Sequence, residues 1–427
     1  MQMLQKIKSL LNTDLTKVFS LNALATLVKM LTGFVSVKVV AVLIGPAGIA
    51  LLGQLNNFST IFLTLSTGGI YSGITKYIAE NAGSQKKINI FLRTSVWITV
   101  VLSCACALIL IIGSGYFSRI ILKDDSYQSI MVVFGLTIIM YSLNGLASAI
   151  INGYKLFKDY VKINIGSSIV GLLFVVAFAN FYGLYGALLA TVTYQSVVFI
   201  ITVLVCARHP WFKKVNLLGR FNFLASKRLA QFSLMALVSA ATVPVSQLIV
   251  RGLLTTHTSI HDAGIWEGMN RISGMYLMVI TSSLAVYYLP RLAEIKTKAE
   301  LRNEIFSIYK FVLPFLFIST TLIYLFRHLV IRILFNDDFI GMEHFFIYQL
   351  AGDFFKIGSW LLAYQMLAKS MTRMFILTEI LFSVSLIIFS MLFIATKGAV
   401  GASMAYCINY LLYWILMLVI FRKTLFY

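Results

Sequence analysis

Long apolar stretches recur along the whole chain, and they constrain its fold more than any other feature. A helix needs about 20 mostly apolar residues to cross a bilayer, and hydropathy predicts twelve such segments in the 427 residues. They are expected near residues 18–44, 48–78, 92–115, 129–152, 162–180, 184–206, 229–251, 262–289, 305–326, 344–367, 373–395 and 398–421. The connections between them are short, so no separate soluble catalytic or nucleic-acid-binding domain fits.

The composition agrees with an all-α integral membrane protein. Charged residues make up 12% of the chain and apolar and aromatic residues 59%, whereas a soluble domain carries about 25% charged residues. The four cysteines all lie within apolar stretches and show neither zinc-ligand spacing nor a disulfide framework. We therefore expect no metal site and no resident cofactor.

Basic residues predict the direction of the spans, because cytoplasmic loops of membrane proteins are rich in Lys and Arg. With the N-terminus inside, 23 of the 35 Lys and Arg residues fall on the cytoplasmic side. Six fall on the opposite side, namely Arg119, Lys123, Arg251, Arg327, Arg332 and Lys397. An even number of spans then predicts that both termini are cytoplasmic.

The longest connection, residues 207–228, divides the chain into an N-terminal lobe at 1–206 and a C-terminal lobe at 229–427, each with six predicted helices. Its basic residues suit a loop that lies on anionic lipid better than one that binds nucleic acid. A short repeat supports the division, since Ala-Gly-Ile opens both the second and the eighth spans and Ala-Glu closes both. The lobes then form a parallel repeat around a central cavity.

The spans of the N-terminal lobe contain cations and no acid. An ionisable residue inside a membrane is costly unless it faces a cavity or a partner. Lys29 lies in the middle of its span and is expected to line a wet cavity that accepts anions. Lys38 lies half a turn around the same helix, nearer the outer surface, and is a further candidate cavity cation. Lys76 is another candidate, but it lies close enough to the membrane surface to reach it instead.

The spans of the C-terminal lobe contain possible ion pairs. The candidates are Glu267 with Arg271, Asp353 with Lys356, and Lys310 with Glu379. These pairs either fix helix packing or couple transport to an ion, and both interpretations stay open. Over both lobes, six span cations face three acids, and this surplus predicts an anionic cargo such as a phosphate.

Amides in two spans are candidates for contact with sugar hydroxyls. Gln54, Asn56 and Asn57 lie near the predicted outer end of the second span, and Asn270 lies in the eighth. Helix packing is an equally good explanation for them. The chain has no phosphate-binding loop of an ATPase and no outer loop large enough for a glycan polymerase, so we expect a transporter rather than an enzyme.

Several blocks of the sequence resemble the Wzx O-antigen flippases of the multidrug/oligosaccharidyl-lipid/polysaccharide (MOP) exporter superfamily. They are Thr26–Lys29, Gly45–Ile49, Gly73–Glu80, Gly264–Gly268, Asn270–Ser273 and Tyr348–Asp353 with Lys356. The resemblance implies twelve helices in two lobes and alternating access in the bacterial inner membrane. It also implies that Lys29, Lys76 and Arg271 hold the pyrophosphate of an undecaprenyl-linked oligosaccharide, and that an O-antigen polymerase or chain-length regulator is a possible partner.

Together these features predict a flippase that moves undecaprenyl-pyrophosphate-linked O-antigen repeat units from the inner to the outer leaflet. One alternative is a flippase for another lipid-linked glycan, either the enterobacterial common antigen unit or lipid II. Others are a MATE-like small-molecule antiporter and a membrane scaffold for glycan enzymes that transports nothing. A coupling ion, proton or sodium, stays open.

Overall fold

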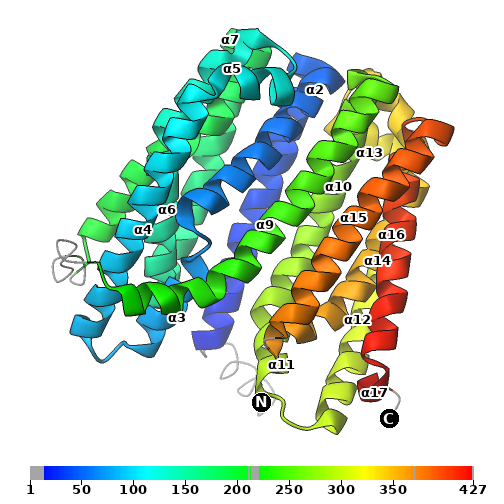
Figure 1. The fold of residues 1–427 in the computed structure, drawn as a ribbon. Helices are drawn as coiled ribbons and strands as arrows, with labels where there is room; N and C mark the ends of the chain where they lie inside the picture. Colours follow the sequence, from blue (N-terminus) through cyan, green and yellow to red (C-terminus); the bar gives the residue numbers. More distant parts are fainter. Residues whose placement is uncertain (1–13, 210–211, 213–220, 370, 426–427) are drawn as a thin grey trace, which may run out of the picture. The chain divides into compact units, whose positions relative to one another are not determined.

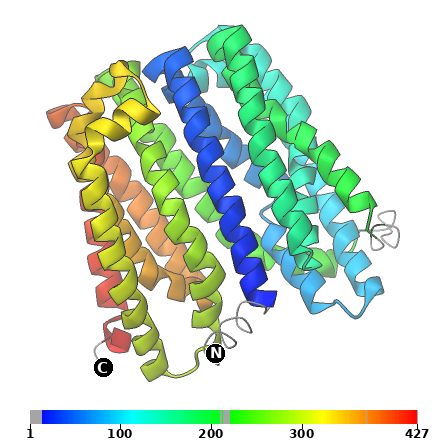
Figure 2. The same cartoon turned by 180° about the vertical axis from the view of Figure 1, so that it is seen from behind.

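The computed structural model describes residues 14–209, 212, 221–369 and 371–425, and every regular element there is a helix (Figures 1 and 2). Within these residues, eight helices are long and apolar enough to cross a membrane. The predicted fold class of an all-helical, multi-pass membrane protein is confirmed.

Two of these helices contain a glycine that interrupts the helical backbone. In α2 (Asp14–Thr67), Gly45 has φ 65° and ψ −171°, and in α7 (Phe157–Ala207), Gly183 has φ 56° and ψ −135°. Residues with a Cβ rarely adopt a positive φ, and the proline after Gly45 strengthens the break because it lacks an amide hydrogen. Both breaks fall between segments that the sequence predicts as separate spans.

The predicted span over residues 48–78 is not one helix, and that prediction is wrong. Helix α2 ends at Thr67, and α3 (Tyr71–Glu80) begins after Gly68 and Gly69, whose φ angles are 60° and 66°. Two consecutive left-handed residues cannot continue a right-handed helix. A Cβ on Gly69 would also lie 3.1 Å from the Cβ of Ala236, so this glycine permits the close approach of α9 (Phe223–His257).

The remaining helices follow in chain order. They are α4 (Gln85–Ile112), α5 (Ser114–Phe117), η1 (Ser118–Leu122), η2 (Asp125–Tyr127), α6 (Gln128–Gly153), α10 (Ile260–Ser283), η3 (Leu284–Tyr288), α11 (Leu289–Glu294), α12 (Lys298–Leu325), α13 (Arg327–Leu334), η4 (Asp337–Met342), α14 (Glu343–Ala368), α15 (Thr372–Lys397), α16 (Val400–Ile420) and α17 (Arg422–Leu425).

The chain forms two compact units, which we call unit 1 and unit 2. Unit 1 holds Met1–Ser36 and Phe58–Ala240, and unit 2 holds Val37–Asn57 and Ala241–Tyr427. The middle of α2 thus belongs to unit 2, and the first half of α9 belongs to unit 1. The lobe boundaries at 206 and 229 stay a prediction, and residues 210–211 and 213–220 of the loop between them lie outside the described residues.

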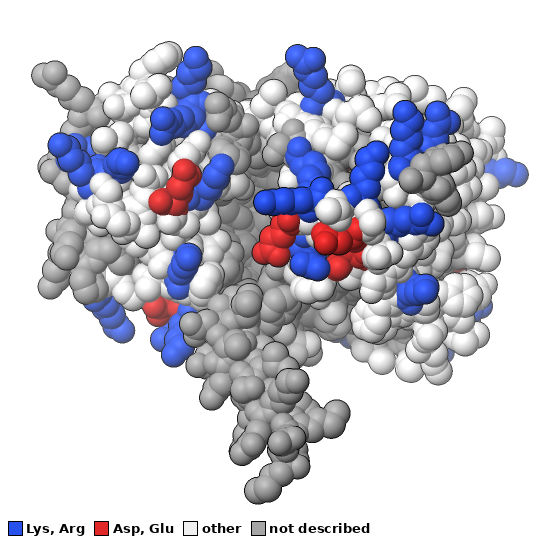
Figure 3. All heavy atoms as spheres, turned by 90° about the horizontal axis from the view of Figure 1, so that it is seen from below, with Lys and Arg blue, Asp and Glu red and all other residues white. Residues whose placement is uncertain are grey.

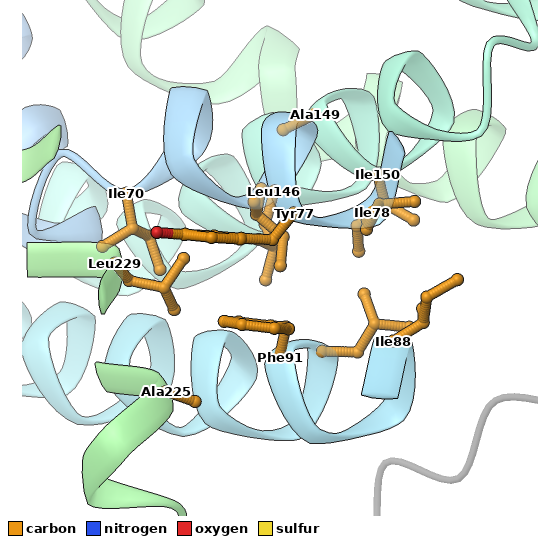
Figure 4. Packing of buried hydrophobic residues seen from close by; sticks show 12 residues of the cluster. Ile70, Tyr77, Ile78, Ile88, Phe91, Leu146, Ala149, Ile150, Ala225 and Leu229 are labelled. Carbon is orange, nitrogen blue, oxygen red and sulfur yellow. The ribbon is translucent and has the colours of Figure 1, made fainter. Parts of the chain in front are cut away.

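In unit 1, aromatic stacking joins α3 to α4. The rings of Tyr77 and Phe91 are 4.5 Å apart and almost parallel, at 3°, and Figure 4 shows them among aliphatic residues of α6. Ala225 and Leu229 complete the same cluster from the start of α9. In unit 2, the fully buried Tyr288 donates from its hydroxyl to the carbonyl oxygen of Leu361 at 3.0 Å.

Basic side chains gather at one end of each unit. In unit 1, Lys86 and Lys87 lie in the first turn of α4. In unit 2, Lys296 and Lys298 lie between α11 and the first turn of α12. On the face that Figure 3 draws, Lys and Arg are more abundant than Asp and Glu. The cytoplasmic position of the termini stays a prediction.

Candidate functional site

A buried ionic cluster in unit 2 joins α2, α9 and α10. Arg251 on α9 is only 1% exposed and contacts a carboxylate oxygen of Glu267 on α10. Its Nη1 also donates to Oε1 of Gln54 on α2 at 2.9 Å. The Nε of Arg271 lies 3.4 Å from the other carboxylate oxygen of Glu267. One carboxylate therefore lies between two guanidinium groups, and the cluster carries a net positive charge.

Two glycines create the space for this cluster. A Cβ on Gly53 would lie 2.5 Å from the carboxyl carbon of Glu267, and a Cβ on Gly264 would lie 1.9 Å from the carbonyl oxygen of Pro46. The absence of both side chains allows α10 to pack directly against α2 and brings the carboxylate beside the guanidinium groups. Gly53 and Gly264, the glycine of the second Ala-Gly-Ile block, thus have a packing role.

Further groups surround the Arg251 guanidinium. Its carbon lies 5.6 Å from the ring centre of Trp266, a distance at which cation–π attraction is effective. With its amide oxygen turned toward the guanidinium, Asn57 accepts from Nη1 at 3.2 Å, and its nitrogen then donates to Gln247 at 3.1 Å. Of the predicted sugar-binding amides, Gln54 and Asn57 therefore contact Arg251, whereas Asn56 is exposed.

The predicted end of the seventh span at Arg251 is wrong, while the position of this residue toward the outer side of the membrane stays a prediction. Hydropathy ends the span at this residue, but α9 continues to His257, so the side chain lies within the helix and is buried. Its partner Glu267 is on another helix, and no spacing in the sequence indicates that contact. The Glu267–Arg271 pair can be predicted from one helix, because residues four apart share a face. The structure confirms this pair.

A second buried acid, Asp353 on α14, is held by hydroxyl groups. It is 0% exposed and accepts hydrogen bonds at Oδ2 from Ser273 and Tyr276 of α10, both at 2.6 Å. At Oδ1 it accepts from Tyr406 of α16 at 2.8 Å. These three donors satisfy the carboxylate without a cation. The two tyrosines have no counterpart among the residues that the sequence predicts for this site.

The predicted ion pair between Asp353 and Lys356 does not form in the described part of the chain. The Nζ of Lys356 instead lies 4.9 Å from the ring centre of Trp360, 5.6 Å from that of Tyr406 and 5.3 Å from that of Tyr410. An ammonium group gains from the negative faces of these rings. Tyr406 thus contacts both charged residues and lies where a direct ion pair was expected.

The predicted pair of Lys310 and Glu379 is also not formed within the described residues. Lys310 is exposed, and Glu379 accepts a hydrogen bond from Thr242 at 3.4 Å. Glu379 and Lys356 do lie together, because both line a cavity of about 70 Å³ in unit 2. Asn270 lines the same cavity, and within the described chain its amide nitrogen makes no hydrogen bond.

Lys38 binds the end of a helix. Its Nζ donates to the carbonyl oxygen of Arg332 at 2.9 Å and to that of Phe335, at the C-terminal end of α13. Carbonyl groups at a helix C-terminus lack helical donors and carry partial negative charge, so a cation is favourable there. Lys38 thus makes a structural contact within unit 2, and its role as a cavity cation stays a prediction.

The two other predicted cations of the N-terminal half belong to unit 1. Lys29 is exposed and makes no ion pair with any described residue, and Lys76 is exposed with its Nζ 5.8 Å from the ring centre of Tyr77. Arg271 belongs to unit 2. That these three residues serve one phosphate site stays a prediction.

Comparisons with known proteins identify the class of molecule. A family model described as "Polysaccharide biosynthesis protein" matches residues 15–296. Proteins named "Lipid III flippase" from Escherichia coli (strain K12) and from Shigella flexneri are each 29% identical over 401 residues, which cover 94% of this chain and 96% of theirs.

Solved structures show the same fold. An inward-facing MATE family transporter of the MOP superfamily matches with a TM-score of 0.75 at 13% identity, covering 94% of each chain. The lipid II flippase MurJ in an inward closed conformation also matches with a TM-score of 0.75 at 13% identity, over 96% of this chain and 89% of that one. These matches show that the chain has the fold shared by the MATE transporter and MurJ. This chain belongs to the polysaccharide biosynthesis protein family.

Proposed function

We propose that this protein is a flippase that moves an undecaprenyl-pyrophosphate-linked oligosaccharide from the inner to the outer leaflet of a bacterial inner membrane. The observation that carries the proposal is the likeness to proteins named lipid III flippase along 94% of this chain. A match of that extent includes both compact units. The buried charges of unit 2 support the same class of cargo.

The charge of the Arg251 cluster suits an anionic group. Arg251 is 1% exposed and holds Glu267, whereas the side chain of Arg271 is 18% exposed and shares the same carboxylate at a longer distance. Arg271 is therefore the guanidinium that a phosphate can reach. Its planar fork matches two oxygens of a phosphate. We propose Arg271 with Lys29 and Lys76 as the pyrophosphate-binding cations.

The identity of the glycan follows from the relatives rather than from the geometry. Blocks of the sequence resemble O-antigen flippases, but the similar proteins are named for lipid III. Their names support the alternative of an enterobacterial common antigen unit better than an O-antigen unit. We therefore propose a glycan of the lipid III type as the first cargo to test, with an O-antigen repeat unit as the second.

We further propose twelve membrane crossings with both termini in the cytoplasm. The interrupted helices α2 and α7 would contribute two crossings each, and α4, α6, α9, α12, α15 and α16 one each. Helices α10 and α14, with 24 and 26 residues, are long enough to add the last two. They overlap the spans that the sequence predicts near residues 262–289 and 344–367.

Deletion and complementation in the host test this proposal. Without the gene, the lipid-linked oligosaccharide should accumulate on the inner leaflet and the corresponding surface glycan should disappear. The variant Arg271→Ala should reduce export by about tenfold or more, since a hydrogen bond to a charged group contributes about 1.5–3 kcal/mol. The control is Lys397→Ala, which also removes one positive charge but at an exposed residue. A deletion strain with unchanged surface glycan and no accumulated intermediate would contradict the proposal.

A further inference from the structure

Unit 1 contains a larger cavity of a different chemical character. It has a volume of about 450 Å³, which falls within the range of about 300–1,000 Å³ typical of small-molecule sites. It is lined by Leu63, Thr64, Thr67, Gly69, Tyr71, Ser72, Tyr141, Asn144, Gly145, Ser148, Ile163, Asn164, Ser167, Gln195, Ala236 and Ala240. None of these side chains is charged, and most of them carry a hydroxyl or an amide.

A chain of hydrogen bonds fixes two amides of this cavity, those of Asn144 and Gln195. Thr202 donates to Oδ1 of Asn144 at 2.7 Å, and Nδ2 of Asn144 donates to Oε1 of Gln195 at 2.7 Å. Nε2 of Gln195 then donates to the hydroxyl of Ser167 at 3.1 Å. Each amide nitrogen has two hydrogens, and these bonds use one of each. The protein therefore sets the direction of both amides and leaves one N–H on each for a ligand.

Other polar groups of the lining have hydrogen-bonding capacity left. Ser72 and Ser148 make no hydrogen bond within the described part of the chain. The amide nitrogen of Asn164 donates to the carbonyl oxygen of Tyr160 at 2.9 Å, and its Oδ1 stays available as an acceptor. The cavity thus offers both donors and acceptors at several positions around its wall.

Two tyrosine rings add flat, rigid surfaces. The Tyr71 hydroxyl donates to the carbonyl oxygen of Ser142 at 2.8 Å, and a Cβ on Gly145 would lie 2.2 Å from that hydroxyl, so only glycine leaves room for it. Tyr141 packs edge-on against Tyr194, with ring centres 6.5 Å apart and planes at 76°. An aromatic ring presents an apolar face beside a polar hydroxyl, which suits the carbon face and the hydroxyl rim of a pyranose.

We propose that this cavity is a neutral sugar subsite, which binds hydroxyl-bearing residues of the glycan separately from the pyrophosphate. The inference rests on the proposed function. A diphosphate would lose its hydration here without gaining a cation, which is unfavourable. Sugar hydroxyls need paired neutral donors and acceptors, and a site built to hydrogen-bond a hydroxyl discriminates strongly against ligands that lack it.

Binding of the free sugar is the direct test. Mild acid releases a soluble oligosaccharide from the lipid-linked glycan that accumulates in the deletion strain, and calorimetry measures its binding to the purified full-length protein. Ser148→Phe should fill the cavity and weaken binding by at least about tenfold, and Asn164→Ala should weaken it by about 2–10-fold through the loss of one neutral hydrogen bond. Met140→Phe is the matched control on α6, since Met140 is 46% exposed outside the cavity.

Separate outcomes test the subsite and the transport function. Arg271→Ala should bind the phosphate-free oligosaccharide as the wild type does while its export of the lipid-linked glycan falls. Wild-type protein that binds no free oligosaccharide, or equal binding by Ser148→Phe, Asn164→Ala and Met140→Phe, would overturn the subsite and leave a water-filled cavity. The proposed flippase function would survive that result if wild-type protein still exports the intact lipid-linked glycan.

Discussion

The Arg251 cluster allows the contribution of one buried ion pair to be measured. Arg251→Met removes the charge but keeps an unbranched side chain, and it leaves Glu267 with Arg271, 3.4 Å away, as its remaining cation. Removing one partner of a buried pair costs about 3–5 kcal/mol. Because Arg271 still compensates part of the carboxylate charge, we expect the lower value. A loss of about 3 kcal/mol is a factor of about 100 in the unfolding equilibrium.

The substitution of the partner residue, Glu267, and the double variant complete a double-mutant cycle. Glu267→Gln should destabilise the protein at least as much, because two guanidinium groups then lie close together without a carboxylate between them. In the double variant of Arg251→Met and Glu267→Gln, both charges of the pair are removed. Its loss of stability should be smaller than the sum of the single losses by about 2 kcal/mol, within the range of about 0.5–3 kcal/mol seen for contacting residues.

Reversible unfolding in mixed micelles with increasing SDS, followed by tryptophan fluorescence, provides these free energies. Trp266 contacts the Arg251 guanidinium and reports on this cluster. The control is Arg302→Met, an exposed arginine on α12 that stacks on Phe306 and should leave the transition unchanged. Single effects that add within about 0.3 kcal/mol in the double variant would refute the idea that Arg251 and Glu267 act as a pair.

Three further substitutions have defined outcomes. Gly264→Ala places a Cβ 1.9 Å from a backbone oxygen of α2 and should lower the free energy of unfolding by about 1–3 kcal/mol in the same assay. The control on the same helix is Gly274→Ala, whose Cβ meets no atom within 4 Å and should change that free energy by less than about 1 kcal/mol. Lys38→Met should cost about 1–2 kcal/mol and speed amide exchange in α13; normal stability with lost export would show a transport role instead. Asp353→Asn replaces an acceptor of three hydroxyl donors by a group that also donates, so export should fall by about tenfold while the exposed control Asp338→Asn exports normally.

The helical positions were largely predictable because local rules determine them. Apolar length locates the spans, and the breaks at Gly45 and Gly183 follow from the positive φ that glycine tolerates. The break at Gly68 and Gly69 was missed because hydropathy measures apolarity and not backbone angle. Two adjacent glycines inside a long apolar stretch were the available signal for it.

The contacts of the candidate site were predictable only where one helix contains both partners. The pairing of Glu267 with Arg271 follows from helical periodicity. The contact of Arg251 with Glu267, and the three hydroxyl donors of Asp353, depend on which helices pack together, and residue spacing carries no information about that. Lys38 shows the same limit, since the carbonyl groups that it binds lie almost 300 residues further along the chain.

Unit 2 is built from two separate segments of the chain, and this affects the order in which its parts are synthesised. Residues 37–57 belong to this unit, but about 180 residues of unit 1 are synthesised before the rest of it begins at residue 241. At about 5–20 residues per second, the early segment waits in the membrane for about 10–40 s before its neighbours exist. During that interval Lys38 and Gln54 have none of their unit 2 partners. Translation speed over residues 58–240 therefore sets how long the nascent chain exposes a charged, incomplete helix to the insertion machinery and to membrane proteases.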